Sequence, residues 1–378
     1  MTDVMIAAYR RSPFHFANKG ELTKARPDEM AAEVIRALVA EAGIDPATIE
    51  DLILGCAFPE GEQGLNMARL VGFLAGLSQD TGGVTVNRFC GSSMQSVHQA
   101  AGAIRMGAGD AFLCAGVESM SRVPMMGFNP MPHPGLAQSY PQAYIGMGET
   151  AENVAKRHQV TRADQEEFAV RSHAKAAAAQ AAGKLAPEIV PITIGERSVS
   201  QDGCIRAETT AEGLAGLKPV FQQDGTVTAG TASPLTDGAS ALLVCSAEYA
   251  RTHGLRVLAK VASIAVAGCA PEIMGMGPVG ASRKALARAG ISAGDLDVVE
   301  LNEAFASQAL ACMRDLGIDE AKVNKDGGAI ALGHPLGATG ARIVGKAAQV
   351  LHRDGGRYAL ATQCIGGGQG IATVLEAV

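Results

Sequence analysis

The stretch AGIDPATIEDLILG, residues 42–55, returns in a related form as AGISAGDLDVVELN, residues 289–302. Each copy follows a stretch of helical periodicity, at 28–42 in the first case and at 281–289 in the second. A glycine behind such a stretch is the usual helix C-cap, and the apolar run that ends each copy is typical of a buried strand. Both copies therefore predict one unit: a helix, a glycine cap, a short turn and a strand.

Two further pairs of segments repeat in the same order. The dipeptide Val-Asn, at 86–87 and again at 323–324, precedes a glycine-rich turn and a long alanine-rich helix in both places. The apolar segments GDAFLCAG (109–116) and GRYALATQC (356–364) follow these helices. Strands and helices thus alternate twice in one order, which predicts a duplicated α/β domain.

The chain length supports more than one structural unit. At 378 residues the chain exceeds what one hydrophobic core usually organises. We predict an N-terminal half at 1–119, completed by about 234–258, and a C-terminal half at 259–378. The intervening residues 120–233 differ in composition, and we interpret them as an inserted loop domain.

The inserted segment begins with MSRVPMMGFNPMPHPGLAQSYPQAYIGMG (120–148), which is rich in Met and Pro and almost uncharged. Such a composition does not form regular secondary structure throughout. Two interpretations stay open. The stretch is either a packed surface excursion or subunit contact, or a flexible apolar wall for an acyl group, since methionine adapts to varied shapes. A helical segment at 150–183 and a polar, β-like stretch reaching Thr231 are expected to follow.

Composition excludes several classes of function. The net charge is −6 and the basic residues are scattered, which argues against nucleic acid as the main partner. No uncharged apolar run is long enough to span a membrane, and the first residues lack the pattern of a targeting peptide, so we expect a cytoplasmic chain. The eight cysteines lack paired spacing, which indicates reduced thiols. Neither CxxC nor HExxH occurs, so no metal site is predicted.

Two of the cysteines stand in unusual surroundings. Cys90, in VNRFCGSSMQ, lies where a β-prone run turns into a helix start, and a helix N-terminus favours the thiolate. Cys364, in ATQCIGGGQG, ends an apolar strand before a glycine run that leaves backbone amides open to a substrate. We therefore expect both thiols to be exposed and reactive. The alternative is two ordinary buried cysteines.

Seven segments carry a resemblance to a known family. In this order and with these approximate spacings, they resemble the thiolases, and among them the degradative 3-ketoacyl-CoA thiolases (acetyl-CoA C-acyltransferases). The resemblance runs nearly from end to end and implies the family's five-layered αβαβα fold, with two βαβαβαββ halves and a loop domain. The segments are NRFCGSSMQ (87–95), GMGETAENVA (146–155), TVTAGTASPLTDGA (226–239), MGMGPVGAS (274–282), NEAFA (302–306), GGAIALGHPLGATGAR (327–342) and CIGGGQG (364–370).

Cleavage of a 3-ketoacyl thioester needs a nucleophile, a base that activates it, a proton donor for the departing acetyl-CoA carbanion, and donors for two oxyanions. Cys90 fits the nucleophile. His334, held between glycines and Pro335, fits the base, because imidazole titrates near neutral pH. Cys364 fits the second acid/base, as a thiol near its ordinary pKa. The other histidines that we considered are expected to be satisfied surface residues: His15, His158, His173, His253 and His352.

The remaining site residues follow from the resemblance. Asn302 would hold a water that, together with His334, binds the thioester oxygen, although an Asn after a strand is more often a turn or helix cap. The backbone N–H groups of Cys90 and Gly366 would form the second oxyanion hole. Glu303 receives no firm role.

The resemblance also implies substrate contacts. Ser233 would touch the pantetheine arm of coenzyme A, and Met147 and Met274 would line the acyl end, although isolated methionines are usually core. Lys218 is a candidate for the adenine and phosphate end. Gly146 replaces a histidine typical of short-chain biosynthetic thiolases, and Thr339 replaces a serine. The first departure favours longer acyl chains and degradation.

Coenzyme A is expected as co-substrate, with no permanently bound cofactor. The family implies a homodimer or homotetramer, and a hydratase/dehydrogenase subunit is a further possible partner. Alternatives are an acetoacetyl-CoA thiolase working in the condensing direction, a ketosynthase-like condensing enzyme and a non-catalytic acyl-CoA-binding subunit. A nicotinamide dehydrogenase is disfavoured, because GGGQG leads into a strand rather than opening a helix.

Overall fold

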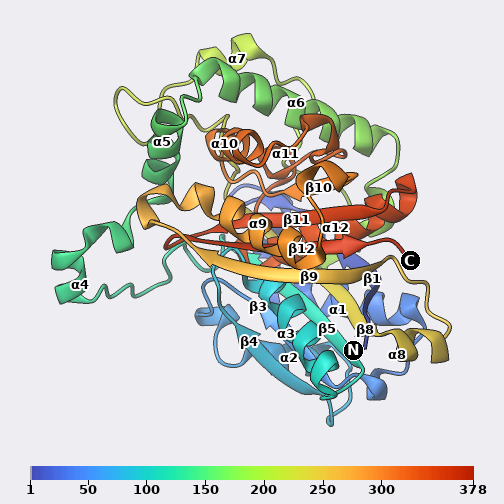
Figure 1. The fold of residues 1–378 in the computed structure, drawn as a ribbon. Coiled ribbons are helices and arrows are strands. Elements are labelled where there is room, and N and C mark those ends of the chain that lie inside the picture. The colour runs from blue at the N-terminus through green and yellow to red at the C-terminus, as the bar shows by residue number, and fades with distance from the viewer. Residues whose placement is uncertain (1) are drawn as a thin grey trace.

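The computed structural model describes residues 2–378 and shows two copies of a similar order of elements, the second with a short helix, α11, and no full strand at the place of the third strand (Figure 1). The first copy reads strand, helix, strand, helix, strand, helix, strand, strand, and its last strand comes after the inserted segment. It comprises β1 (Val4–Arg11), α1 (Pro27–Ala42), β3 (Asp51–Gly55), α2 (Met67–Ala75), β4 (Gly82–Val86), α3 (Ser92–Met106), β5 (Ala111–Ser119) and β8 (Thr236–Ser246). The second copy comprises β9 (Ala259–Gly268), α9 (Gly277–Ala289), β10 (Val298–Leu301), α10 (Ala306–Leu316), α11 (Ala329–Leu332), α12 (Leu336–Asp354), β11 (Tyr358–Ile365) and β12 (Gln369–Glu376).

The strands of the two copies pair in the same way. In the first copy the order is β4-β3-β5-β8-β1, with the first three strands parallel and the last two antiparallel. In the second copy β10 and β11 are parallel, and β12 and β9 follow antiparallel. The equivalent of β4 has shrunk to one bridge between Val299 and Val323. The predicted duplication is confirmed, with one strand of the second half reduced to a single residue pair.

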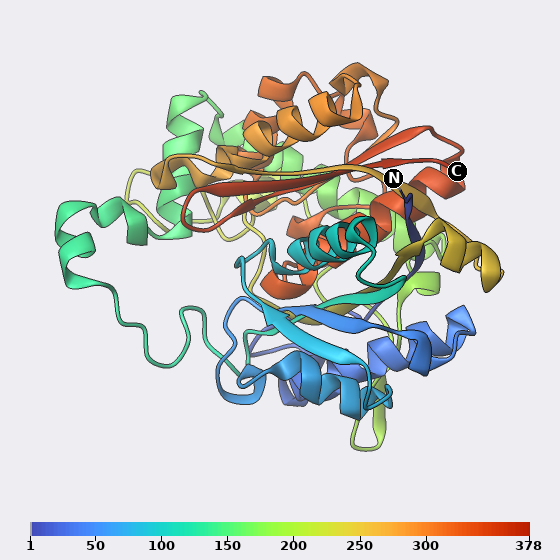
Figure 2. The same cartoon turned by 60° about the horizontal axis from the view of Figure 1, so that its bottom comes forward.

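The two strand sets form one continuous sheet only through a narrow junction, where β1 meets β9 at Met5–Lys260 and Ile6–Ala259. Beyond it the sets diverge and enclose α3 and α12 as a central helical layer (Figure 2). Helices α1 and α2 cover the outer face of one set, and α9 and α10 cover that of the other. Separate apolar cores fill these contacts, so the five-layered αβαβα fold is confirmed.

The stretch that is repeated at residues 42–55 and 289–302 forms the predicted unit in both halves. Gly43 and Gly290 end α1 and α9 in the left-handed conformation, with φ of 65° and 71°. Glycine adopts this region without the strain of a Cβ, which explains its place in both copies. A short 3-10 helix follows each cap, at Pro46–Thr48 and at Ala293–Asp295, before strands β3 and β10.

The segment between β5 and β8 adds no strand to the large sheet. The helix expected at 150–183 is two helices, because the turn before the Thr161 capping box separates them. The β-like stretch expected up to Thr231 is wrong: within it the structure has only one hairpin of three-residue strands, and glycine and proline interrupt the remainder. The domain boundaries themselves stay predictions. The segment contains α4 (Pro134–Ser139), α5 (Met147–Arg157), α6 (Arg162–Ala181), β6 (Ile192–Ile194), β7 (Arg197–Val199) and α7 (Ala211–Ala215).

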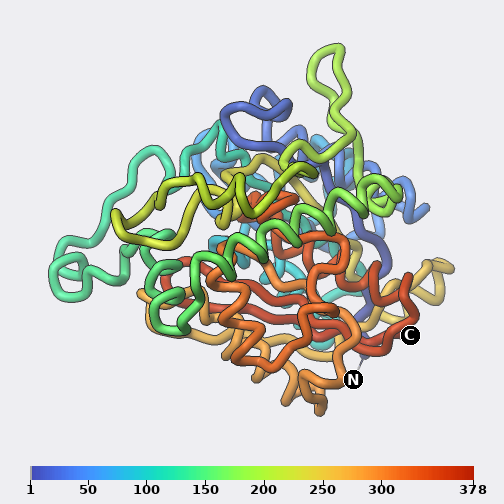
Figure 3. The backbone as a smooth tube through the Cα atoms, turned by 90° about the horizontal axis from the view of Figure 1, so that it is seen from above, coloured from blue at the N-terminus to red at the C-terminus, as the bar shows by residue number. Residues whose placement is uncertain are grey.

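The Met/Pro-rich part of this segment extends from the body as an arm that carries α4 (Figures 1 and 2). Its apolar side chains are exposed, with Phe128 at 60% and Met131 at 81%. The hairpin β6–β7 protrudes on another side (Figure 3). Two further short elements are β2 (His15–Phe16) and α8 (Ala247–Thr252). None of the helices within residues 2–378 combines the length and apolar character needed to cross a bilayer.

Candidate functional site

Cys90 lies in a sharp turn between β4 and α3. Phe89 adopts a positive φ of 43°, which is uncommon for a bulky residue and marks local strain. Ser92, in the first turn of α3, fastens the turn: its Oγ accepts from the N–H of Arg88 at 2.9 Å and donates to the carbonyl of Phe89 at 2.6 Å. Gln363 donates to the carbonyl of Cys90 from β11. The turn therefore holds the Cys90 backbone between the two halves of the fold.

The glycine run after Cys364 brings a second backbone to the same place. Strands β11 and β12 are joined by a tight turn in which Gly367 and Gly368 have φ of 80° and 84°. The backbone N–H groups of Gly366 and of Cys90 itself lie near the sulfur of Cys90 and act to lower its pKa. Two backbone donors from opposite halves of the fold thus lie beside one sulfur, which is where the donors of an oxyanion hole are needed when that sulfur attacks a carbonyl.

The two thiols are less exposed and less acidic than the sequence suggested. Cys90 is half-buried and Cys364 is buried. Burial raises the pKa of Cys90 to about 11 against the opposing effect of the two backbone N–H groups. Burial likewise raises the pKa of Cys364 well above its ordinary value, and the neighbouring Cys90 adds to this. The expected thiolate preference is wrong, because loss of hydration outweighs the helix terminus, and both groups rest as thiols.

His334 lies buried just before α12, and its protonation state is clear from its surroundings. Burial and the nearby Arg342 lower its pKa to about 3, so the ring is neutral at physiological pH. Its Nδ1 lies 2.6 Å from Oγ1 of Thr339, and that hydroxyl also faces the carbonyl of Pro335 at 3.3 Å. The hydroxyl donates to the carbonyl and accepts from Nδ1–H, which leaves Nε2 as a free base.

Asn302 lies beside this imidazole, with its Nδ2 3.4 Å from Nε2 of His334. The N–H of Asn302 donates to the carbonyl of Thr362 in β11, while its buried Oδ1 has no hydrogen-bond partner within residues 2–378. The helix-cap interpretation is wrong, because α10 begins only at Ala306 with Phe305 at the cap position. A buried unpaired amide oxygen next to a histidine is suited to holding a water.

An apolar cluster surrounds Cys364 and includes both predicted acyl-site methionines. Met274 is fully buried in it, and Met147 packs against it from α5. The sulfur of Met147 also lies 3.5 Å from where a side chain on Gly366 would begin. The structure thus brings Met147 and Met274 to the site, whereas the exposed arm that precedes Met147 stays outside it. The other members are Ala151, Val227, Ala232, Ala304 and Phe305.

The other predicted contacts lie at the edge of this cluster. Ser233 is half-buried, and its Oγ donates to the carbonyl of Ala304 at 3.1 Å. Lys218 is exposed on the segment that also carries Phe221, whose ring packs edge-on against Phe305 with centroids 6.0 Å apart. Ser233 is therefore at the site, whereas Lys218 is an exposed residue three positions before Phe221.

Several residues that support the site were missed from the sequence. Thr236 accepts from the N–H of His334 at 3.0 Å. Glu303 is buried and accepts from Ser172, Asn324 and the N–H of Ile330 at 2.6, 2.8 and 3.1 Å, which holds the short helix α11 that precedes His334. The repeated Val-Asn dipeptide containing Asn324 is the signal that pointed here.

Two histidines expected at the surface are buried instead. His15 bonds the carbonyl of Gln201 at 2.9 Å through Nε2, and His173 bonds the N–H of Arg206 at 3.1 Å through Nδ1. Both are satisfied by backbone groups of the inserted segment, which the local sequence does not reveal.

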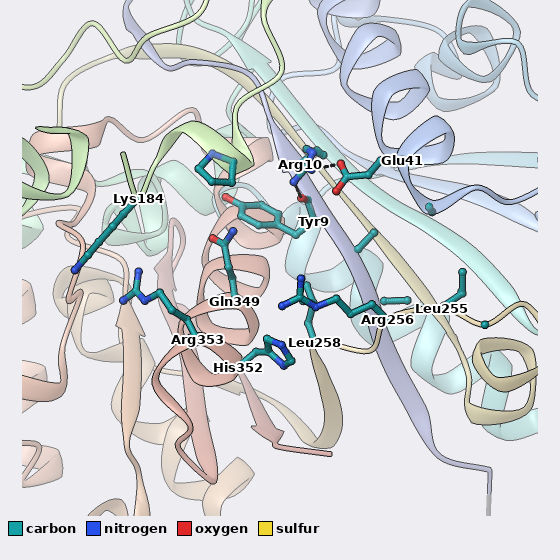
Figure 4. A pocket seen from close by; sticks show the side chains of 15 residues that line it. Tyr9, Arg10, Glu41, Lys184, Leu255, Arg256, Leu258, Gln349, His352 and Arg353 are labelled. Carbon is teal, nitrogen blue, oxygen red and sulfur yellow. Dashed lines mark hydrogen bonds and ion pairs between the residues drawn. The ribbon is translucent and has the colours of Figure 1, made fainter. Parts of the chain in front are cut away.

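A cavity of about 540 Å³ lies apart from these residues, where β1 meets the C-terminal end of α12 (Figure 4). Its labelled side chains include Tyr9, Arg10, Gln349 and Arg353, and Arg10 pairs with Glu41 there. Gln349, which lines the cavity, lies roughly 20 Å along α12 from Leu336, the first residue of the helix after His334 and Pro335, so the cavity is not part of the thiol site.

Comparisons with known proteins agree with this geometry. The chain matches the family model of the thiolase N-terminal domain at residues 4–248 and that of the C-terminal domain at 255–377. It is 47% identical to the 3-ketoacyl-CoA thiolase of Bacillus subtilis over 389 residues and 49% identical to that of Shewanella denitrificans over 391 residues, with 100% of each chain covered.

Solved structures give the same result. Human mitochondrial 3-ketoacyl-CoA thiolase in complex with CoA matches with a TM-score of 0.93 at 37% identity, over 100% of this chain and 98% of that one. Acetyl-CoA acetyltransferase of Bacillus anthracis matches with a TM-score of 0.93 at 40% identity, over 100% and 99%. Since both domain models match and the relatives align over their full length, this chain belongs to the thiolase family.

Proposed function

We propose that this chain catalyses the thiolytic cleavage of 3-ketoacyl-CoA by coenzyme A, which gives acetyl-CoA and an acyl-CoA shortened by one acetyl unit, as in fatty acid β-oxidation. The observation that carries the proposal is the convergence of two backbone N–H groups on the Cys90 sulfur, beside a second thiol and near an apolar cluster. The full-length similarity to 3-ketoacyl-CoA thiolases supports the substrate class.

In the first half-reaction, Nε2 of His334 takes the proton of Cys90 as the sulfur attacks the ketone carbon. Because burial favours the neutral forms of both groups, proton transfer accompanies the attack rather than preceding it. The oxyanion that forms is held by the N–H groups of Cys90 and Gly366. The bond between the ketone carbon and the adjacent carbon then breaks, and its electron pair becomes the enolate of acetyl-CoA.

Cys364 donates its proton to that enolate carbon, while His334 and a water on Asn302 stabilise the enolate oxygen. The raised pKa of Cys364 supports this role, because the group rests as a protonated acid. In the second half-reaction, the Cys364 thiolate takes the proton of incoming coenzyme A. The new thiolate attacks the acyl-Cys90 thioester, and the sulfur of Cys90 leaves and recovers its proton from His334.

The substrate contacts of the proposal rest on the apolar cluster and its rim. Met147 and Met274 line the acyl chain, Ser233 contacts the pantetheine arm, and Lys218 contacts the adenine and phosphate end. Coenzyme A enters as co-substrate, and no permanently bound cofactor takes part in the proposed steps.

The condensing direction is a second candidate, because the chain also resembles an acetyl-CoA acetyltransferase at 40% identity. Thiolysis rates measured with 3-ketoacyl-CoA substrates of increasing acyl chain length, with products identified by mass spectrometry, distinguish the degradative from the condensing function. Activity that rises or stays level beyond acetoacetyl-CoA supports the degradative proposal. Activity confined to acetoacetyl-CoA supports the acetyltransferase, and no turnover with any chain length contradicts both.

The proposal includes a homodimer or homotetramer located in the cytoplasm, and association with a hydratase/dehydrogenase subunit. The exposed apolar side chains of the arm and of α2, such as Phe73 and Phe128, support self-association. Sedimentation of the purified chain, alone and with such a subunit, measures both associations.

A further inference from the structure

Glu118 is a buried carboxylate at the end of β5 that none of the proposed catalytic steps uses. The strand before it is apolar, and the side chain is 1% exposed. A charge at such a position requires a full set of partners, because leaving it unpaired costs far more than the strand gains from packing.

The partners of Glu118 come from two separate segments, the loop that follows β3 and the first turn of α12. Its Oε2 accepts from the N–H of Ala57 at 2.8 Å and from the N–H of Gly337 at 2.9 Å. Its Oε1 accepts from the N–H of Phe58 at 3.2 Å and from Nε2 of Gln63 at 3.0 Å. All these groups are donors, which favours the ionised carboxylate, while burial acts more strongly in the other direction and raises the pKa of Glu118.

One of these segments supports the Cys90 turn. Asn87 donates to the carbonyl of Ala57 at 2.9 Å, and its Oδ1 accepts from the N–H of Phe89 at 2.8 Å. The ring of Phe58 also packs against that of Phe89, with centroids 6.0 Å apart. The position of the Ala57–Phe58 backbone therefore determines where the strained residue before Cys90 lies.

The other segment follows the base. Gly337 is in the first turn of α12, three residues after His334. No side chain fits there, because a Cβ on Gly337 would lie 2.5 Å from the carbonyl of Val117. The Gly337 N–H can thus approach the end of β5 closely.

We propose that Glu118 is a positioning residue of the thiolysis reaction: one carboxylate joins the loop that supports Cys90 to the helix turn that follows His334, and so fixes the nucleophile relative to its base. This inference rests on the proposed function of Cys90 and His334. The negative charge of Glu118 also lies close enough to Cys90 to add to the effect of burial in raising the thiol pKa.

The test uses Glu118→Gln in the full-length protein. An amide offers one accepting oxygen, so either the Ala57 and Gly337 contacts or the Phe58 and Gln63 contacts are lost. We expect kcat for thiolysis to fall about 10²-fold, as for a displaced catalytic pair, with KM for the substrate changed little. The pH midpoint of Cys90 alkylation by iodoacetamide should move to lower pH, because a negative charge near the thiol is removed.

Asp237→Asn is the matched control. Asp237 is a buried carboxylate opposite Ser119 in the same sheet, and it accepts from the N–H of Ser121 at 2.9 Å and from the hydroxyls of both serines, without bonding the Cys90 loop or α12. We expect this variant to alkylate with the wild-type pH midpoint. An unchanged midpoint and kcat in a folded Glu118→Gln protein, or the same midpoint shift in both variants, overturns the inference.

If Glu118→Gln does not fold, Glu118→Asp takes its place, since it keeps the charge but is too short to reach both segments. It should lose kcat without moving the alkylation midpoint, and full activity overturns the inference. A failure of the proposed function would be recognised independently of the Glu118 variants, because Cys90 of the wild-type protein would then accept no acetyl group from acetyl-CoA.

Discussion

Replacement of Thr339 by Val tests how His334 is oriented. Valine has nearly the shape of threonine, so the change removes only the hydroxyl, which accepts from Nδ1 of His334 at 2.6 Å and donates to the carbonyl of Pro335 at 3.3 Å. The buried Nδ1–H then has no partner, and the loss is greatest when the ring carries a proton during the attack of Cys90.

The magnitude follows from the geometry. A hydrogen bond to a charged group contributes about 1.5–3 kcal/mol, and each 1.36 kcal/mol of activation energy is about tenfold in rate. We therefore expect kcat/KM for thiolysis of a 3-ketoacyl-CoA to fall about 10- to 150-fold in Thr339→Val. Thr339→Ser is the control, because it keeps the hydroxyl and matches the residue usual in the motif, and it should stay near the wild-type rate.

The assay is the steady-state rate of acetyl-CoA formation, together with the rate at which acetyl-CoA acetylates Cys90. Both rates should fall together in Thr339→Val, because His334 serves both. A Thr339→Val enzyme within about twofold of wild type in both assays would refute the orientation of His334 deduced here, because that difference is below about 0.5 kcal/mol.

Two further predictions concern the pocket and the pH dependence of stability. Met147→Phe should lower kcat/KM for long 3-ketoacyl-CoA substrates more than for acetoacetyl-CoA, because overpacking an apolar site costs about 1–3 kcal/mol. An equal loss of kcat/KM at every chain length, together with dissociation of the oligomer in light scattering, would instead place Met147 at a subunit contact. Burial, with Arg88 nearby, lowers the pKa of His98 to about 3. Because this histidine binds fewer protons in the folded than in the unfolded protein, its contribution to folding stability is fully present above pH 6.5 and is lost as the pH falls toward 3. Between pH 7 and pH 5 this lowers the free energy of unfolding by about 2 kcal/mol. Urea unfolding of His98→Gln should not show this decrease, and an identical pH dependence of stability in the variant and the wild type would contradict the prediction.

The repeated elements were predictable because each depends on local chemistry. A glycine cap such as Gly43 or Gly290 and the apolar strand that follows it are determined by residues that are neighbours in the sequence. The convergence of Cys90 and Gly366 was expected from the family resemblance alone, since no local pattern brings together residues so far apart in the chain.

The electrostatics of the site could not be read from the sequence. A helix N-terminus at Cys90 suggested a lowered pKa, but burial of the thiol in the folded chain reverses the direction. The partners of Glu118 and Glu303 are likewise distant in sequence, so a charged residue at a strand end gave no sign of its role. Burial and long-range hydrogen bonds are properties of the folded chain.

In the proposed reaction Cys90 carries the acyl group and Cys364 transfers the proton at carbon, and two assays on the same proteins distinguish these roles. Mass spectrometry of wild type, Cys90→Ala and Cys364→Ala after incubation with an acyl-CoA, paired with cleavage of a 3-ketoacyl-CoA by each protein, separates acylation from carbon–carbon chemistry. Wild type and Cys364→Ala should carry the acyl group on Cys90, Cys90→Ala should carry none, and only wild type should cleave the 3-ketoacyl-CoA. An acyl group on Cys364 in the Cys90→Ala protein, or cleavage that persists without Cys364, would contradict the account.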